Sequence, residues 1–123
     1  MKKICKLKPG KIPIKEHILQ KAIVAYLRSR GYRTQCNDVF NAVKYINGEN
    51  KRIIEISHLK AMGAGKGYPD LTAHCKDETV YIEIKTDKGR LSPEQKDWQE
   101  YFTRTGRKYI VARSVMDLMA AGI

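Results

Sequence analysis

Three residues whose side chains suit phosphodiester hydrolysis lie close together in the chain: Asp70, Glu83 and Lys85. Proteins bind Mg²⁺ through one or two carboxylates together with water and substrate phosphate. The bound ion polarises phosphoryl oxygens and lowers the pKa of a coordinated water. A lysine beside it can position that water and offset the charge that develops. The three side chains could form such a site if the secondary structure brings them together.

The stretch 79–86 predicts a β-strand with alternating apolar and polar residues. Because side chains alternate between the two faces of a strand, Glu83 and Lys85 project from the same face. Residues 71–75 predict a partner strand, and residues 76–78 predict the turn between the two. A β-hairpin is therefore the simplest connection.

The hairpin register decides whether the second carboxylate joins the first. If Lys76 pairs with Thr79, then Asp70 faces Lys85 and lies diagonal to Glu83, at roughly 5–8 Å. A slip of one residue would turn Asp70 to the opposite face. The interpretation therefore requires a register of the right parity.

The acid-x-Lys triplet alone carries little information, because it also occurs at 49–51 and 94–96. The triplet at 83–85 differs in lying on an alternating strand that follows the chain's single Pro-Asp pair. The alternative interpretation is an exposed ion pair on a solvated sheet face, worth about 0–1 kcal/mol. Helices predicted on both sides of this hairpin in the sequence favour a site.

The composition indicates a small basic globular protein. The chain has 123 residues and a formal charge of +11, which favours a polyanionic partner such as a nucleic acid. Residues 1–12 predict a basic N-terminal arm, and 13–123 a single domain. No apolar run approaches the length of a membrane span, and the N-terminus lacks a signal core. The three cysteines have no metal-binding or disulfide spacing, so a cytoplasmic location is expected.

The remaining elements surround the hairpin. A helix is predicted over 13–30, strands over 32–36, 39–46, 52–57 and 108–112, a glycine-containing loop over 58–67, and a short helix over 115–121 capped by Ser114. Another helix begins with Ser92 as N-cap, Pro93 at the first position and Gln95 three residues after the serine. Gly106 ends it, and the expected fold class is α/β.

Two further polar residues have a structural explanation from the sequence alone. Glu16 lies in the first turn of the first helix, where an acid is favoured by the helix dipole. Gln95 shares a helix face with Trp98 and Phe102, which predicts an aromatic contact with the core. The loop glycines would let the backbone pass close to the site or to a bound phosphate.

The order of these features resembles the PD-(D/E)xK nucleases, and among them the VRR-NUC domain of replication and repair nucleases. The resemblance covers about residues 14–116. It rests on Glu16, Gly67-x-Pro69-Asp70, Glu83-Ile84-Lys85 and Lys88-Gly89-Arg90-Leu91-Ser92-x-x-Gln95. The last block is the most distinctive of this branch.

The resemblance implies a restriction-endonuclease-like α/β core, with a mixed central sheet flanked by helices in the rough order α-β-β-β-α-β and a short C-terminal helix. It implies that Asp70, Glu83 and the carbonyl of Ile84 hold Mg²⁺ or Mn²⁺. Lys85 would assist the attacking water. The same resemblance implies that Glu16 is an acid of the metal site and that Gln95 completes the pocket.

Stand-alone members of this family resemble junction-resolving enzymes. The resemblance therefore implies a structure-selective DNA endonuclease, such as a phage or prophage Holliday-junction resolvase. Cutting both strands of a symmetric junction would require a two-fold homodimer. The alternatives are a flap or nicking nuclease with the same site, and a non-catalytic basic DNA-binding module. Candidate DNA contacts are Lys60, Lys66, Lys88 and Arg90.

Overall fold

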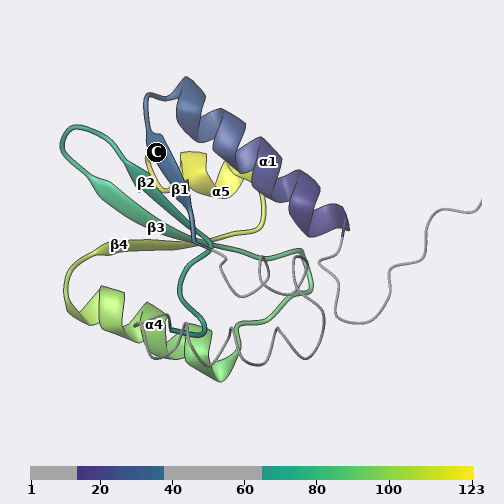
Figure 1. The fold of residues 1–123 in the computed structure, drawn as a ribbon, viewed down its shortest axis with the longest axis vertical. Helices are drawn as coiled ribbons and strands as arrows, with labels where there is room; N and C mark the ends of the chain where they lie inside the picture. Colours follow the sequence, from purple (N-terminus) through teal and green to yellow (C-terminus); the bar gives the residue numbers. More distant parts are fainter. Residues whose placement is uncertain (1–13, 38–64) are drawn as a thin grey trace, which may run out of the picture.

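The structure of the protein, a computed structural model, describes residues 14–37 and 65–123 (Figure 1). The elements in these ranges are α1 (Ile14–Ser29), β1 (Arg33–Cys36), β2 (Leu71–His74), β3 (Thr79–Ile84), α4 (Pro93–Arg104), β4 (Lys108–Ala112) and α5 (Val115–Ala120). The predicted arm 1–12, the predicted strands 39–46 and 52–57, and Lys60 lie outside the described residues. No helix in the described part has the length and apolarity that a membrane crossing requires.

The strands form one mixed sheet in the order β1-β2-β3-β4. The first three are antiparallel neighbours, whereas β3 and β4 are parallel. A parallel pair needs a crossover connection, and α4 supplies it. Figure 1 shows α1 and α5 on one side of the sheet and α4 on the other. The predicted α/β fold with a mixed sheet flanked by helices is confirmed.

The hairpin register differs from the prediction by two residues. Thr79 pairs with His74 instead of Lys76, and Thr72 faces Tyr81 instead of Glu83. The turn lies one position earlier, where the Cys75 amide donates to the Glu78 carbonyl at 2.9 Å. An even shift leaves every side chain on its expected face. The predicted parity was therefore right and the predicted pairing wrong.

The two faces of the sheet have different chemistry. The face toward α1 and α5 is aliphatic, and its core includes Ile23, Leu27, Val80, Ile82, Ile84, Ala112 and Leu118. The face toward α4 is aromatic, with Tyr81 stacked on Phe102 at 4.2 Å between ring centroids. The predicted packing of Trp98 and Phe102 is confirmed, since their rings stack on each other at 5.5 Å.

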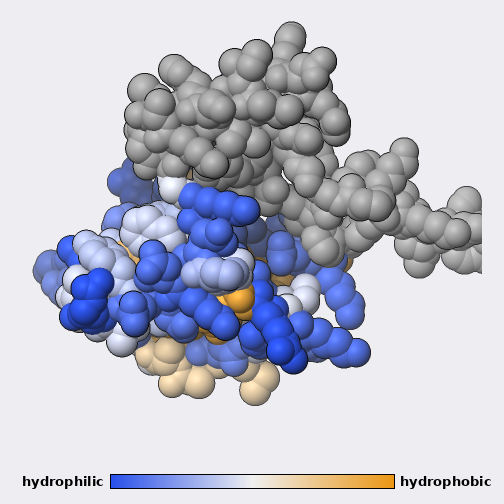
Figure 2. All heavy atoms as spheres, turned by 90° about the horizontal axis from the view of Figure 1, so that it is seen from below, coloured by the Kyte–Doolittle hydropathy of each residue, from blue (hydrophilic) through white to orange (hydrophobic). Residues whose placement is uncertain are grey.

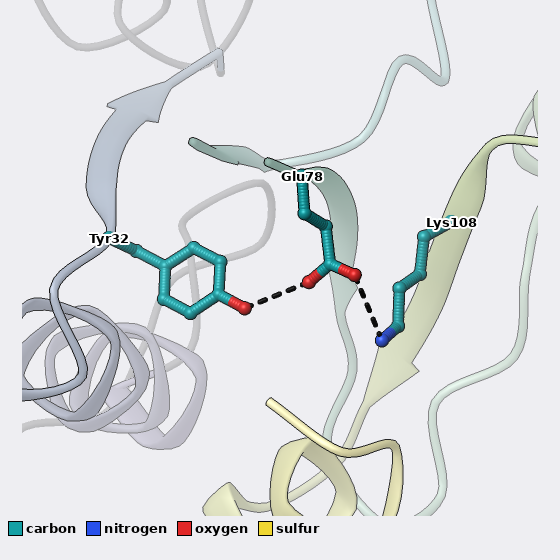
Figure 3. A network of polar contacts seen from close by, with 3 residues as sticks. All are labelled: Tyr32, Glu78 and Lys108. Atoms are coloured by element: carbon teal, nitrogen blue, oxygen red, sulfur yellow. Dashed lines mark hydrogen bonds and ion pairs between the residues drawn. The ribbon is translucent and has the colours of Figure 1, made fainter. Parts of the chain in front are cut away.

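A polar network ties the hairpin end of the sheet together (Figure 3). The Tyr32 hydroxyl donates to Glu78 Oε2 at 2.8 Å, and the Lys108 ammonium reaches Glu78 Oε1 at 3.4 Å. Tyr32 follows α1, Glu78 precedes β3 and Lys108 begins β4. One carboxylate therefore links three segments that are distant in sequence.

The C-terminal helix begins where predicted but without the predicted cap. Ser114 occupies the N-cap position with extended backbone, yet its side chain makes no capping hydrogen bond. Asp117 in the first turn instead accepts a hydrogen bond from the Arg113 amide at 2.7 Å. The acid therefore holds the chain where it enters α5.

Candidate active site

The register of β2 and β3 brings two carboxylates together. Leu71 pairs with Ile82, so Asp70, directly before β2, comes opposite Glu83 at the far end of the hairpin from its turn. Oδ2 of Asp70 accepts a hydrogen bond from the Ile84 amide at 2.8 Å. This bond fixes the Asp70 side chain against β3, next to Glu83.

Glu83 is a charged side chain in the interior. It is only 1% exposed. Burial raises the pKa of Glu83 to about 9, with further contributions from the charge and hydrogen bonding of Asp70 and from the charge of Glu16. Lys85 acts in the opposite direction. Without a cation, the surroundings therefore favour the neutral acid.

Gln95 connects the start of α4 to this carboxylate. Its backbone amide donates to the Ser92 hydroxyl at 3.2 Å, and its Oε1 accepts from the Ser92 amide at 2.8 Å, which completes the predicted capping box. The cap orients the carboxamide so that Nε2 points toward the sheet. Nε2 then donates to Glu83 Oε2 at 3.0 Å. Helix capping and site positioning are thus performed by one side chain.

A pocket of about 200 Å³ lies over these groups. It is lined by Glu16, Asn37, Gly65, Lys66, Gly67, Tyr68, Asp70, Glu83, Ile84, Lys85 and Gln95. All five predicted catalytic residues, and Lys66 among the predicted DNA contacts, therefore face one space. Lys88 and Arg90 are exposed and do not line the pocket.

Asn37 is a pocket residue that the sequence analysis missed. Its amide donates to the Asp70 carbonyl at 2.8 Å, and its Nδ2 donates to the Pro69 carbonyl at 3.2 Å and to the Thr72 hydroxyl at 2.8 Å. These bonds hold the Pro69-Asp70 segment against the end of β1. The only local signal was an asparagine directly after a predicted strand, and its partners are more than thirty positions away.

Gly67, in the loop before Asp70, is at a position where only glycine fits. Its φ of +84° lies in the left-handed region, and a Cβ there would come within 2.7 Å of Glu94 and 2.9 Å of the Gln95 amide. The loop backbone therefore packs directly on the first turn of α4. The close backbone approach at this position is thus to the start of α4, and Gly67 also lines the pocket.

Arg113 is a second residue that the sequence did not single out. Its Nη1 donates to the carbonyl of Thr86 at 2.6 Å and to that of Gly89 at 2.7 Å. A Cβ on Gly89 would lie 3.3 Å from Cδ of Lys85, so the turn is packed on the lysine stem. Arg113 thus braces the turn that supports Lys85.

The oxygen atoms at the site fit a hard divalent cation. Oε1 of Glu83 is buried and accepts no hydrogen bond within the described part of the chain, whereas Oε2 is held by Gln95. A buried oxygen without a donor is costly unless a ligand satisfies it. Mg²⁺ and Mn²⁺ prefer carboxylate and carbonyl oxygens, so Asp70, Glu83 and the Ile84 carbonyl would hold the ion.

Glu16 belongs to α1 and not to the β2–β3 hairpin that carries Asp70 and Glu83. It lines the space and its charge reaches Glu83. Yet residues 14–37 and 65–123 contain no group of three or more His, Cys, Asp or Glu side chains placed to hold a metal ion. Its contact with a metal therefore stays a prediction.

The described residues thus form a mixed sheet flanked by helices, with two carboxylates, a lysine and a capping glutamine around one pocket. A family model described as "VRR-NUC domain" matches residues 14–116. The protein belongs to the VRR-NUC family, whose domain has a nuclease-type function in DNA processing.

The fold agrees with that assignment. A solved structure titled "VRR_NUC domain protein" is similar, with a TM-score of 0.63 and 18% sequence identity over 89% of this chain and 86% of the other. No curated protein sequence matches the chain.

Proposed function

We propose that the protein is a metal-dependent, structure-selective DNA endonuclease that hydrolyses phosphodiester bonds, and that it acts as a homodimeric Holliday-junction resolvase with Mg²⁺ or Mn²⁺. The observation that carries the metal-dependent chemistry is the buried Oε1 of Glu83, which lacks a hydrogen-bond donor in the described residues and lies beside Asp70. A buried carboxylate oxygen without a donor is commonly satisfied by an ion or a water, and a second carboxylate beside it favours a cation.

The protein's own groups have distinct roles in this proposal. The Ile84 amide fixes Oδ2 of Asp70 and Gln95 fixes Oε2 of Glu83, which leaves the other oxygen of each carboxylate for a ligand in the pocket that both residues line. Lys85 faces the same pocket and would hold the attacking water and offset negative charge at the phosphoryl group. A divalent cation held there would polarise the phosphoryl oxygens and lower the pKa of the water.

The proposed dimer follows from the symmetry of the substrate. Asp70, Glu83, Lys85 and Gln95 line one pocket of a single chain, and a four-way junction needs two symmetric cuts. A two-fold dimer supplies two pockets related by the same symmetry as the junction. The net charge of +11 supports a polyanionic substrate.

The test is a comparison of four substrates: a four-way junction, a 5′ flap, a nicked duplex and a linear duplex. Each is incubated with Mg²⁺, with Mn²⁺ and with EDTA, and Asp70→Asn serves as the inactive control. We expect symmetric cuts on opposite strands of the junction with metal only. Cleavage confined to flaps or nicks would support the alternative nuclease, and no cleavage of any substrate would refute the endonuclease.

The oligomeric state needs a separate measurement. Analytical ultracentrifugation of the free protein and of its complex with a junction in EDTA should show a dimer in the complex. A strict monomer in both would remove the paired-cut part of the proposal and leave the chemistry of the pocket unaffected.

A further inference from the structure

A line of aromatic rings leads away from the pocket along α4. Tyr68 lines the pocket, and its ring meets Trp98 edge-on at 4.8 Å between centroids. Trp98 in turn meets Tyr101 edge-on at 5.8 Å. Tyr101 is 40% exposed, so the far end of this line of rings reaches the surface.

Two arginines converge on this exposed ring. The guanidinium carbon of Arg104 lies 5.7 Å from the Tyr101 centroid, and that of Arg107 lies 5.8 Å from it. Both side chains are exposed, and neither is in salt-bridge distance of an acidic side chain in the described part of the chain. Two like charges are thus held at one ring, and within residues 14–37 and 65–123 neither forms an ion pair with an acidic side chain.

We propose that Tyr101, Arg104 and Arg107 form a second DNA-contact site that binds backbone phosphates of the duplex arm beside the cut. The inference rests on the proposed function, because it assigns part of the same substrate. Arg104 lies nine positions after Gln95, a distance of about 14 Å along α4, or about four base pairs of duplex.

The geometry suits phosphate better than a stacked base. Guanidinium groups resting on the ring are restricted in their rotamers before DNA arrives, so less side-chain entropy is lost on binding. Their forked donors match phosphate oxygens in a bidentate arrangement. Figure 2 views the molecule from the α4 side, and most of the described surface in this view is hydrophilic, as a contact with a hydrated backbone requires.

The test measures DNA affinity against salt. Binding to a fluorescent four-way junction is followed by anisotropy in EDTA between about 50 and 200 mM KCl. In the double variant Arg104→Gln/Arg107→Gln, we expect the slope of log K against log[salt] to fall by about 1.8 in magnitude, and affinity at the upper salt concentration to drop roughly tenfold.

A matched double variant controls for net charge. Arg28 and Arg30 are exposed at the end of α1, on the opposite side of the sheet. Arg28→Gln/Arg30→Gln removes the same charge and should leave the slope close to the wild-type value. An equal fall in both double variants, or no fall in the first, would overturn the site.

Two additional measurements separate this site from the active site and from stability. Tyr101→Leu keeps both charges, so it should weaken binding roughly threefold without changing the slope; unchanged binding would remove the ring from the proposal. Thermal unfolding of every variant excludes a folding defect. If the wild type cleaves nothing with metal, the proposed function fails, whereas the EDTA binding result still decides the arginine site.

Discussion

The two faces of the central sheet divide stability and chemistry between them. On the side of α1 and α5, β3 presents Val80, Ile82 and Ile84, all at most 1% exposed and packed among aliphatic side chains. On the side of α4 the same strand presents Tyr81 and Glu83. Both buried polar residues of the described chain, Thr72 and Glu83, lie on this second face. One strand thus contributes a hydrophobic core and a desolvated acid in alternate positions.

Burying Glu83 on the α4 side of the sheet costs stability that burial of an aliphatic side chain does not. An apolar side chain gains about 1.5–3 kcal/mol from full burial, whereas a buried carboxylate has to be neutralised, hydrogen-bonded or bound to a cation. The stability gained by burying the aliphatic side chains therefore offsets the cost of the buried acid on the opposite face of the sheet. The following experiments test this division, beginning with the largest expected effect.

Removing the chemistry should leave the fold in place. Lys85→Ala and Asp70→Asn should each lower the cleavage rate by about a thousandfold or more, roughly 4 kcal/mol in transition-state free energy, since each removes a group at the reacting atoms. Single-turnover cleavage of the preferred substrate measures this. Lys76→Ala is the control, because that lysine is exposed in the hairpin turn and does not line the pocket. Cleavage persisting in both site variants would refute the site assignment.

A substitution on the aliphatic face should lower the stability of the fold and not act on the reacting groups directly. Ile82→Ala removes a fully buried side chain and should lower the free energy of unfolding by about 3 kcal/mol. Urea unfolding followed by circular dichroism measures it. Ile18→Ala, at a position 62% exposed, should change stability by less than about 0.5 kcal/mol. A small effect at Ile82 would contradict the proposed division of the two faces.

Neutralising the buried acid should strengthen the metal-free fold. In Glu83→Gln the amide can still accept from Gln95 and can donate to Asp70, and folding no longer requires protonation of a buried acid. Stability near neutral pH should therefore rise by about 1–2 kcal/mol. Thermal unfolding in EDTA and in Mg²⁺ measures both effects. Mg²⁺ should raise the melting temperature of the wild type but not of the variant. A destabilised variant without metal would show that Glu83 serves structure.

Removing the Arg113 hydrogen bonds that hold the turn next to Lys85 should slow cleavage without weakening DNA binding. Arg113→Gln loses the charge-assisted bonds to the Thr86 and Gly89 carbonyls, and we expect cleavage to fall about tenfold, or 1.4 kcal/mol. The effect should vanish in a Lys85→Ala background if the arginine acts through the lysine. Additive losses would indicate a separate role for Arg113.

The smallest effect is expected at the hairpin end, far from the pocket. Tyr32→Phe removes the hydrogen bond to Glu78 and should cost about 1 kcal/mol without changing cleavage. Burial and Glu78 raise the pKa of Tyr32 to about 12, against 10.0 in the ordinary state. The folded protein therefore holds the phenol proton more tightly, and this contribution is present below pH 10 and lost as pH rises toward 12. Unfolding curves across that range should converge for the two proteins; a constant gap would contradict the assignment.

The features that are local in sequence were predictable. Alternation in β3 placed Glu83 and Lys85 on one face, and the Ser92-Pro93 start with Gln95 predicted the capping box. The same local reasoning failed where a short turn can close in more than one way, so the pairing of Thr72 was wrong by two residues. Ser114 was also expected to cap α5 through its side chain and makes no such bond, whereas Asp117 accepts from the Arg113 amide there.

The chain alone determined which acids could meet, because strand parity and helix capping depend on neighbours a few residues apart. Only the tertiary structure decided how deeply Glu83 is buried and how Asn37 and Arg113 hold the segments that carry Asp70 and Lys85. Those contacts join residues more than twenty positions apart. Their existence depends on the packing of a whole sheet between its helices, and short-range patterns do not encode that packing.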